Sequence, residues 1–271
     1  MRLQPHVDLA SAIATVQDLL IECGNYSGSA TSYPSRCEHY RTWVGRADQQ
    51  LRNTFTDDEP GQSLYTTSYW ELTRLHPESP QSMGLLEREI QLQSARLLAL
   101  RIKMQRLQLF VGHPGEIVIP DTSALVRGEL FTGFDWPTRL HLGPPVRLII
   151  PILVVEELDR LKDSERTTKA GDKARRVLKV LRELCRTLDP AVPAPVRTGT
   201  TVEVFLDDDW HLRRSIPDAE IIEQALSIES LTGKKVTLVC VDAAMEFRAR
   251  QFGLKVQQMP TPDEVRQSAE S

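Results

Sequence analysis

Acidic residues stand at or just beyond the ends of short apolar runs in the second half of this 271-residue chain, where buried strands are expected. Burying an ionised carboxylate without a partner is costly. Two carboxylates about 4 Å apart also repel each other by roughly 4 kcal/mol at an effective dielectric near 20. Acids gathered at one edge of a sheet therefore require a positive partner. The acids in these positions are Asp121, Glu156, Glu157 and Asp242, and a fourth site is expected at Asp218, in the first turn of a helix after Pro217.

The expected partner is a hard divalent cation. Carboxylate oxygens without a nearby histidine or thiol ligand select Mg²⁺ or Mn²⁺ rather than zinc. The six histidines show no HxxxH spacing, and the four cysteines form no CxxC pair. Single residues keep other interpretations: Asp218 also suits a helix cap. One of Glu156 and Glu157 is expected to be solvated, because neighbours on a helix point about 100° apart.

The second half of the chain alternates apolar runs with helical patterns, which predicts an α/β domain. Parallel strands need a crossover long enough to hold a helix, so the alternation indicates a parallel sheet flanked by helices. Sites in such sheets form beyond the carboxyl ends of the strands, which is where the acids stand. We expect strands over 116–120, 146–151, 201–206, 236–241 and 254–259, and helices over 154–162, 219–228 and 243–253.

The first half of the chain predicts an all-α helical domain. Apolar residues spaced three and four apart indicate helices, the longest of them over 84–110. A capping-box spacing occurs at Ser35 with Glu38 and again at Ser68 with Glu71, so helices are expected to start there. The expected organisation is a helical domain over 1–112, an α/β domain over 115–260 and a flexible tail over 261–271.

Composition and charge limit the class of protein. Hydrophobic residues make up 41% of the chain and charged residues 26%, as in soluble globular proteins. The longest apolar run, Leu148–Val155, has eight residues, too few to span a bilayer, so no membrane partner is expected. Scattered cysteines and the lack of a secretory signal pattern favour the cytoplasm. A net charge of −4 argues against non-specific coating of nucleic acid but allows a local basic surface.

The order and surroundings of the acids resemble the PIN domain family of metal-dependent nucleases over about residues 116–259. The apolar strand followed by Asp121, Thr122 and Ser123 is similar to the first motif of that family. The segment VVEELDRLK is similar to the second motif. The register of the second motif selects Glu157 over its neighbour.

Two later motifs extend the resemblance. Asp218 with Ile221 is similar to the third motif, a D-x-x-I pattern at a helix start. Asp242 with Met245 is similar to the last motif, in which an apolar strand ends in T-x-D-x-x-L/M. The chain departs from that motif at Cys240, where the family commonly has Thr or Ser. A thiol is a poor ligand for a hard metal or for its water.

The resemblance implies Mg²⁺- or Mn²⁺-dependent hydrolysis of phosphodiester bonds by an endonuclease, usually of RNA rather than DNA. Such a mechanism uses metal-bound water and needs no side-chain nucleophile. Ser123 would then position that water, and it equally suits a helix cap. Cys240 keeps open the alternative of a catalytically weak PIN-like protein that binds RNA or acts as a scaffold. The implied catalytic and metal-binding residues are Asp121, Glu157, Asp218 and Asp242, with Thr122 and Ser123 behind them.

A basic helix is expected after the second motif. Between residues 160 and 186 the chain has ten Lys or Arg against four acids. A charged stripe suits a solvated helix face, but its position next to Glu157 favours contact with a phosphate backbone. The helical domain over 1–112 shows no chemistry of its own, and a homodimer or protein partner through it stays open. The residues on the expected nucleic-acid-binding face are Arg166, Lys169, Lys173 and Arg176.

Overall fold

A computed structural model of the chain divides into two compact units, Met1–Val111 and Gly112–Ser271. The sequence places the domain boundary between residues 112 and 115, next to this division. The tail expected over 261–271 lies outside the described residues. The structure describes residues 2–27, 32–75, 79–165, 167–186, 192–207, 211 and 213–259.

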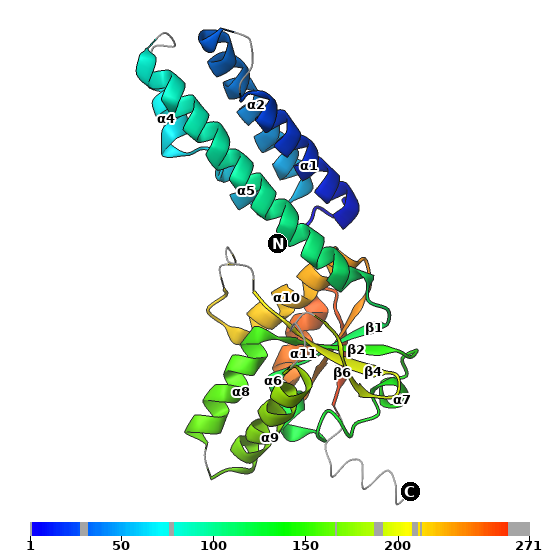
Figure 1. The fold of residues 1–271 in the computed structure, drawn as a ribbon. Helices are drawn as coiled ribbons and strands as arrows, with labels where there is room; N and C mark the ends of the chain where they lie inside the picture. Colours follow the sequence, from blue (N-terminus) through cyan, green and yellow to red (C-terminus); the bar gives the residue numbers. More distant parts are fainter. Residues whose placement is uncertain are drawn as a thin grey trace, which may run out of the picture. The chain divides into compact units, whose positions relative to one another are not determined.

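The first unit is built from helices (Figure 1). Their packing buries a cluster of aromatic rings, in which Tyr40 and Trp43 lie with ring centroids 5.5 Å apart. The buried carboxylate of Glu89 accepts hydrogen bonds from Tyr40 (3.2 Å) and Thr66 (2.7 Å), so this buried charge is paired inside the core. The helices are α1 (Leu9–Asn25), α2 (Tyr33–Thr54), α3 (Glu59–Gln62), α4 (Thr67–Arg74) and α5 (Pro80–Gly112).

Both capping boxes predicted in this unit are wrong. Helix α2 starts before Ser35, with Ser32 at the N-cap position and no hydrogen bond from its side chain. The cap of α4 is Thr66, whose hydroxyl accepts from the backbone N–H of Tyr69 (2.9 Å), so Ser68 lies inside the helix. The Thr66 hydroxyl also donates to the buried Glu89. A tertiary contact therefore fixes where α4 begins, which the local spacing could not show.

The second unit contains a six-stranded sheet in the order β3-β4-β2-β1-β5-β6. Every pairing is parallel except that of β3 with β4, so the predicted α/β class with a mostly parallel sheet is confirmed. The sequence did not predict β3, a four-residue edge strand that contains Pro195. Such a strand is too short to carry an alternating pattern. The strands are β1 (Glu116–Pro120), β2 (Val146–Pro151), β3 (Ala194–Arg197), β4 (Thr200–Phe205), β5 (Val236–Cys240) and β6 (Lys255–Gln258).

Helices follow the strands and flank the sheet, as crossovers between parallel strands must (Figure 1). Every residue of the central strands β2 and β5 is buried, which explains their continuous apolar runs. Three helices begin directly after strands at the carboxyl edge of the sheet, namely α6 after β1, α8 after β2 and α11 after β5. The helices are α6 (Thr122–Arg127), α7 (Trp136–Arg139), α8 (Ile152–Ser164), α9 (Lys169–Leu184), α10 (Pro217–Thr232) and α11 (Ala243–Gln251).

The turn between α8 and α9 depends on Gly171 in the first turn of α9. A Cβ atom at this position would lie 1.9 Å from the backbone oxygen of Glu165, a separation that no side chain tolerates. The hydroxyl of Thr168 caps α9 by accepting from the N–H of Gly171 (3.1 Å). The glycine therefore lets α9 start against the end of α8, and the two helices lie side by side (Figure 1).

Among the described helices, none has both the length and the apolar character that crossing a membrane requires.

Candidate active site

Asp121 directly follows β1, and its carboxylate caps α6. Its backbone N–H continues the sheet by donating to Val239 of β5 (2.9 Å). Its side chain accepts from the N–H of Ala124 (2.7 Å) and from the hydroxyl of Ser123 (2.8 and 2.9 Å). Only 6% of Asp121 is exposed. The core strand can end in a buried acid because the start of the next helix supplies donors to it.

Two further acids act on Asp121 through their charge. Burial is the main cause that raises the pKa of Asp121 to about 6, and the hydrogen bonds from Ala124 and Ser123 oppose it. The charges of Asp218 and Glu157 raise the pKa further. Both acids therefore lie within electrostatic reach of Asp121, although each follows a different strand.

Glu157 lies on the second turn of α8 and faces α6. The hydroxyl of Thr122, the first residue of α6, donates a hydrogen bond to its carboxylate. The neighbouring Glu156 makes a bidentate ion pair with Arg213 (2.6 and 2.9 Å). The two glutamates of the motif thus have separate partners, and Glu156 is held in an ion pair rather than simply solvated.

Asp218 lies in the first turn of α10, after Pro217. Its carboxylate pairs with the guanidinium of Arg248 on α11 at 2.6 Å. The N-cap position of α10 is Ile216, which makes no capping hydrogen bond from its side chain. A pattern within the sequence could not reveal Arg248 as the partner of Asp218, because the two residues meet only when α10 and α11 are side by side.

Asp242 caps α11 by accepting from the N–H of Ala244 (2.8 Å). The buried thiol of Cys240, two residues earlier, donates to the backbone oxygen of Asp242 (3.7 Å). Burial raises the pKa of Cys240 to about 12, and the charges of Asp121, Glu246, Asp242 and Asp218 add to this effect. The thiol therefore stays protonated at neutral pH, with acids of three elements around it.

Ser123 connects the ends of β1 and β5. Its hydroxyl donates to Asp121 and accepts from the backbone N–H of Val241 (3.0 Å). The cap of α6 is Asp121, so the helix-cap interpretation of Ser123 is wrong. Instead, Ser123 fixes the position of the Asp121 carboxylate relative to the strand that leads to Asp242.

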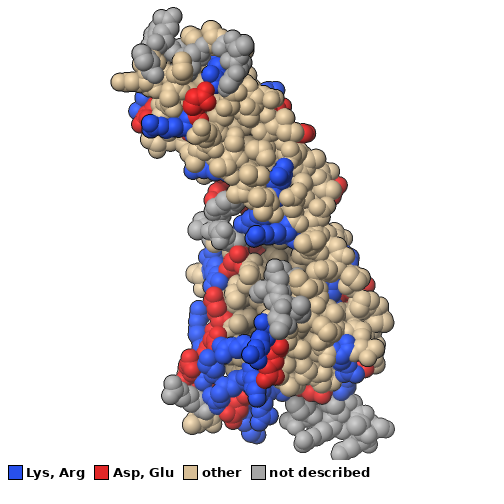
Figure 2. Space-filling view, in the orientation of Figure 1, with Lys and Arg blue, Asp and Glu red and all other residues tan. Residues whose placement is uncertain are grey.

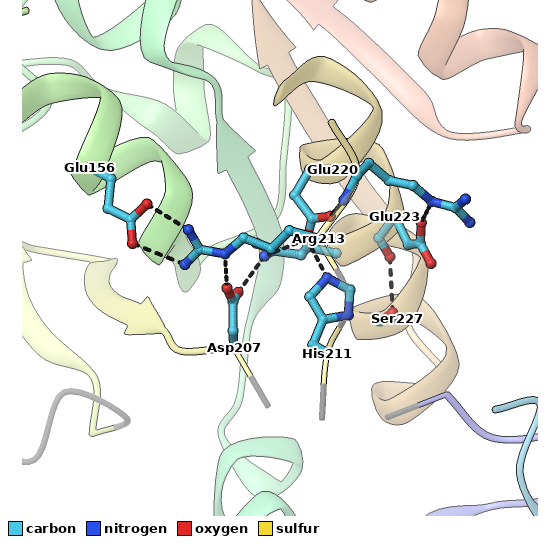
Figure 3. A network of polar contacts seen from close by, with 9 residues as sticks. Glu156, Asp207, His211, Arg213, Glu220, Glu223 and Ser227 are labelled. Atoms are coloured by element: carbon cyan, nitrogen blue, oxygen red, sulfur yellow. Dashed lines mark hydrogen bonds and ion pairs between the residues drawn. The ribbon is translucent and has the colours of Figure 1, made fainter. Parts of the chain in front are cut away.

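A polar network joins the end of β4 to α8 (Figure 3). Arg213 contacts Asp207, just beyond β4, as well as Glu156 on α8. These contacts raise the pKa of Arg213, mainly through the hydrogen bonds to Glu156 and Asp207. Arg213 thereby holds one turn of α8 against the edge of the sheet, and Glu157 lies on that turn.

The same network continues into α10 through the fully buried Glu220 (Figure 3). Its carboxylate contacts the ring of His211 and accepts from the N–H of Arg214 (2.8 Å) and from the amide of Gln224 (3.0 Å). Gln224 also donates to Asp207 at 2.6 Å. The start of α10, which carries Asp218, is therefore attached to the end of β4. Sequence reasoning missed this network, because no motif marks its members.

The expected nucleic-acid-binding face lies on α9, except for Arg166, which lies outside the described residues. Lys169 and Arg176 are exposed, and Lys173 is half-buried. Burial lowers the pKa of Lys173, as does the charge of Arg176, while Glu129 opposes them. Figure 2 shows Lys and Arg side chains gathered over the region of α8 and α9, with Asp and Glu among them.

The donor chemistry of the site fits Mg²⁺ or Mn²⁺, because its acids offer only carboxylate oxygens. Within the described part of the chain, no three His, Cys, Asp or Glu side chains stand close enough together to hold one ion. Two of the acids are instead held by side chains of other helices: Arg248 on α11 pairs with Asp218, and Thr122 on α6 donates to Glu157. These two contacts would have to change for the carboxylates to converge on a cation.

Comparison with known proteins identifies the second unit. Residues 118–260, just over half of the chain, match the family model of the PIN domain. The chain belongs to the PIN domain family. The predicted resemblance to the PIN domain family is therefore confirmed. Members of this family are generally nucleases. The match runs from the third residue of β1 through β6, so all four implied acids lie inside the matched region.

Comparisons with solved structures and with curated proteins add no further information about the function of this PIN domain. A solved domain of a functionally unknown protein from Methanocaldococcus jannaschii DSM 2661 is 18% identical and aligns with 54% of this chain and 93% of its own, at a TM-score of 0.35. No curated protein matches the chain.

Proposed function

We propose that this PIN domain is a Mg²⁺- or Mn²⁺-dependent endonuclease that hydrolyses RNA, with Asp121, Glu157, Asp218 and Asp242 as its catalytic, metal-binding residues. The observation that supports this most is the buried carboxylate of Asp121, whose pKa is raised in part by the charges of Asp218 and Glu157. Acids that repel one another at the carboxyl edge of a parallel sheet are an arrangement that a cation stabilises.

When bound, the metal would supply a water of lowered pKa and neutralise the charge that develops on the phosphate. The fold of the chain holds the acids in position. Asp121 is fixed by the Ala124 N–H and the Ser123 hydroxyl, so one acid is held in place before any ligand arrives. The network of Arg213 and Glu220 holds the two elements that carry Glu157 and Asp218.

A nucleic acid is the proposed substrate class because the basic face of α9 lies beside α6, whose start carries Asp121 and Thr122. RNA is proposed over DNA because the family resemblance usually implies RNA. Glu129, two residues after the end of α6, acts on Lys173 through its charge, and this places the face on the α6 side of α9. In this proposal Arg166, Lys169, Lys173 and Arg176 contact the phosphate backbone of the strand that is cut.

The experiment that tests this function is a cleavage assay on labelled RNA and DNA of the same sequence with Mg²⁺, Mn²⁺ or EDTA. We expect RNA cleavage that EDTA abolishes and that Asp121→Asn reduces by at least about 100-fold, a loss of about 2.7 kcal/mol of barrier lowering. Asp135→Asn is the matched control, because Asp135 caps α7 away from the acids and its loss should leave the rate unchanged. Metal-independent cleavage, or equal rates for the two variants, would refute the proposal.

A second candidate is a catalytically weak PIN domain that binds RNA or acts as a scaffold. The buried, protonated thiol of Cys240 favours it, since this position commonly holds a hydroxyl in the family. Cys240→Ser separates the two candidates. A large rise in cleavage rate with unchanged RNA binding would mean that the natural protein is the weak form, and an unchanged rate would remove the support for that candidate.

A further inference from the structure

A basic groove runs along the seam between α8 and α9 in the PIN domain. Its lining comes from the end of α8 and from one stripe of α9. At 1.5 Å per residue, the helical part of the stripe, from Arg175 to Glu183, is about 12 Å long. Arg186 follows just beyond the end of α9. The charged residues that line the groove are Lys162, Arg175, Lys179, Arg182, Arg186 and Glu183.

The acids beside the groove do not neutralise its cations. Asp159 is shared between Lys162 (2.7 Å) and Arg182 (3.6 Å), Glu183 lies 3.9 Å from Lys179, and Asp172 pairs with Arg175. Three acids thus face the five Lys and Arg residues of the groove. The side chains of Lys179 and Arg182 are 77% and 72% exposed, so these ion pairs contribute little and exchange readily for another anion. The groove is thus a positive surface whose cations are available to a polyanion.

The groove lies on the far side of α8 from the candidate active site. Asp159 is two residues after Glu157 and points about 160° away from it around the helix, at 100° per residue. Glu157 receives the hydrogen bond of Thr122 on α6, whereas Asp159 pairs with cations that line the groove. The body of α8 therefore separates the groove from the acids.

The groove residues of α9 also form a different stripe from the face that is expected to bind nucleic acid beside the acids. On α9 the groove stripe consists of Arg175, Lys179 and Arg182, and it is turned by about 120° from the face that contains Lys173. Arg175 donates to the backbone oxygen of Lys162 (3.1 Å), which places the groove stripe on the α8 side of α9. Lys173 interacts with Glu129 on the α6 side instead. The groove is therefore a second basic surface, separate from the one beside the acids.

We propose that this groove binds the phosphate backbone of an RNA strand at a distance from the bond that is cut. That the bound polyanion is RNA rests on the proposed function. That the groove attracts a polyanion at all follows from its own Lys and Arg side chains. The groove adds contacts between RNA and protein beyond the candidate active site. The PIN domain therefore binds long strands more tightly than short ones.

The width of α8 sets the length at which this preference begins. Half the circumference of a helix with a diameter of about 11 Å is about 17 Å. A strand of roughly four nucleotides spans about 14 Å when stacked at 3.4 Å per nucleotide, so it cannot fill the site and also reach the groove. A strand of roughly 24 nucleotides, about 80 Å when stacked, reaches both.

The test compares two double variants of the full chain that remove the same charge. Lys179→Gln with Arg182→Gln changes the groove, and Lys235→Gln with Lys255→Gln is the control, at two exposed lysines after α10 and in β6. Gln keeps the helix propensity of α9 nearly intact. Fluorescein-labelled oligouridine of the two lengths is titrated in EDTA over a salt series, so that binding is measured without cleavage.

For the long strand, we expect the groove variant to bind more weakly than the control, with a log–log salt slope flatter by about 1.4, or about 0.7 for each lost contact. For the short strand, the two variants should have the same affinity. Equal behaviour of the two variants on the long strand overturns the proposal. An equal loss on both lengths also overturns it, because the groove would then be part of the cleavage path.

Two further outcomes separate this inference from the proposed function. If the groove variant loses affinity for the long strand and no RNA is cut in the metal assay, the groove stands and the nuclease proposal fails. If RNA is cut and the groove variant matches the control, the groove proposal alone fails. Competition by an acidic polyglutamate peptide as strong as that by oligouridine would assign the groove to a protein partner and overturn its role in RNA binding.

Discussion

The guanidinium of Arg248 on α11 lies 2.6 Å from the carboxylate of Asp218 on α10. An arginine thus neutralises an acid whose charge acts on Asp121. Since the two side chains are 49% and 38% exposed, the pair itself contributes at most about 1 kcal/mol to folding. Its main consequence is electrostatic, because it balances part of the negative charge at the site.

Replacing Arg248 should therefore increase the response of the protein to metal. Arg248→Gln frees the Asp218 carboxylate and leaves more negative charge to be neutralised. We expect a larger rise in melting temperature on adding Mn²⁺ than in the natural protein, measured by thermal melts with and without the ion. Arg197→Gln is the control, since Arg197 pairs with Asp135, which caps α7 away from these acids. Equal metal responses in the two variants would contradict the assigned role of Arg248.

Metal should stabilise the fold through Asp121. Binding to the native state favours it by mass action, by about 2.7 kcal/mol at a metal concentration 100 times the dissociation constant. Asp121→Asn should shrink the difference between melts with and without Mn²⁺, while the metal-free melting temperature stays the same or rises. Asparagine keeps an oxygen for the Ala124 N–H, so the cap of α6 should survive. A full metal response in Asp121→Asn would count against an organised site.

The metal-free protein should lose stability as pH rises from about 4 to 7. The folded-state pKa of Asp121 is raised from 3.8 to about 6, so its protonated form favours folding. That contribution is complete below the unfolded pKa and is lost as pH rises through the folded pKa, a change of up to about 3 kcal/mol. Urea unfolding in EDTA measures it. Asp121→Asn should remove this part of the pH dependence, and an unchanged profile would disprove the assignment.

Gly171→Ala should destabilise the PIN domain by about 2 kcal/mol or more, because its Cβ would meet the backbone oxygen of Glu165 at 1.9 Å. Gly45→Ala in α2 is the matched control. A Cβ there meets no atom within 4 Å, so this change should be neutral or stabilise by up to about 1 kcal/mol. Urea unfolding of both variants measures the difference. Equal stabilities would mean that α8 and α9 can separate at this turn without cost.

The basic face of α9 should contribute to RNA affinity in a salt-dependent way. Lys169→Gln with Lys173→Gln leaves the buried stripe of the helix unchanged, so folding should hardly alter. In an Asp242→Asn background, which is expected to bind without cutting, the log–log salt slope for a single RNA strand should flatten by about 0.7 for each lost contact. Superimposable salt curves with and without the Gln changes would show that this face is only solvated.

The sequence alone determined the α/β class, every strand except β3 and the order of the acids. Ile117–Pro120 is a run of buried residues, so its neighbours in sequence suffice to predict a strand, and Asp121 follows it directly. The first motif likewise joins residues that touch: Ser123 and Ala124 both donate to the Asp121 carboxylate two and three positions away. Local patterns succeed here because the interactions that cause them are local.

Tertiary structure decided the partners of the acids. Arg248 is 30 residues from Asp218, and Arg213 is 57 residues from Glu156, so which side chains meet depends on which helices lie side by side. The cap of α4 was decided in the same way, by the contact of Thr66 with the buried Glu89. Spacing within a sequence predicts where a charge stands along the chain. The charge that balances it is fixed only when distant elements pack together, because electrostatic energy depends on separation in space.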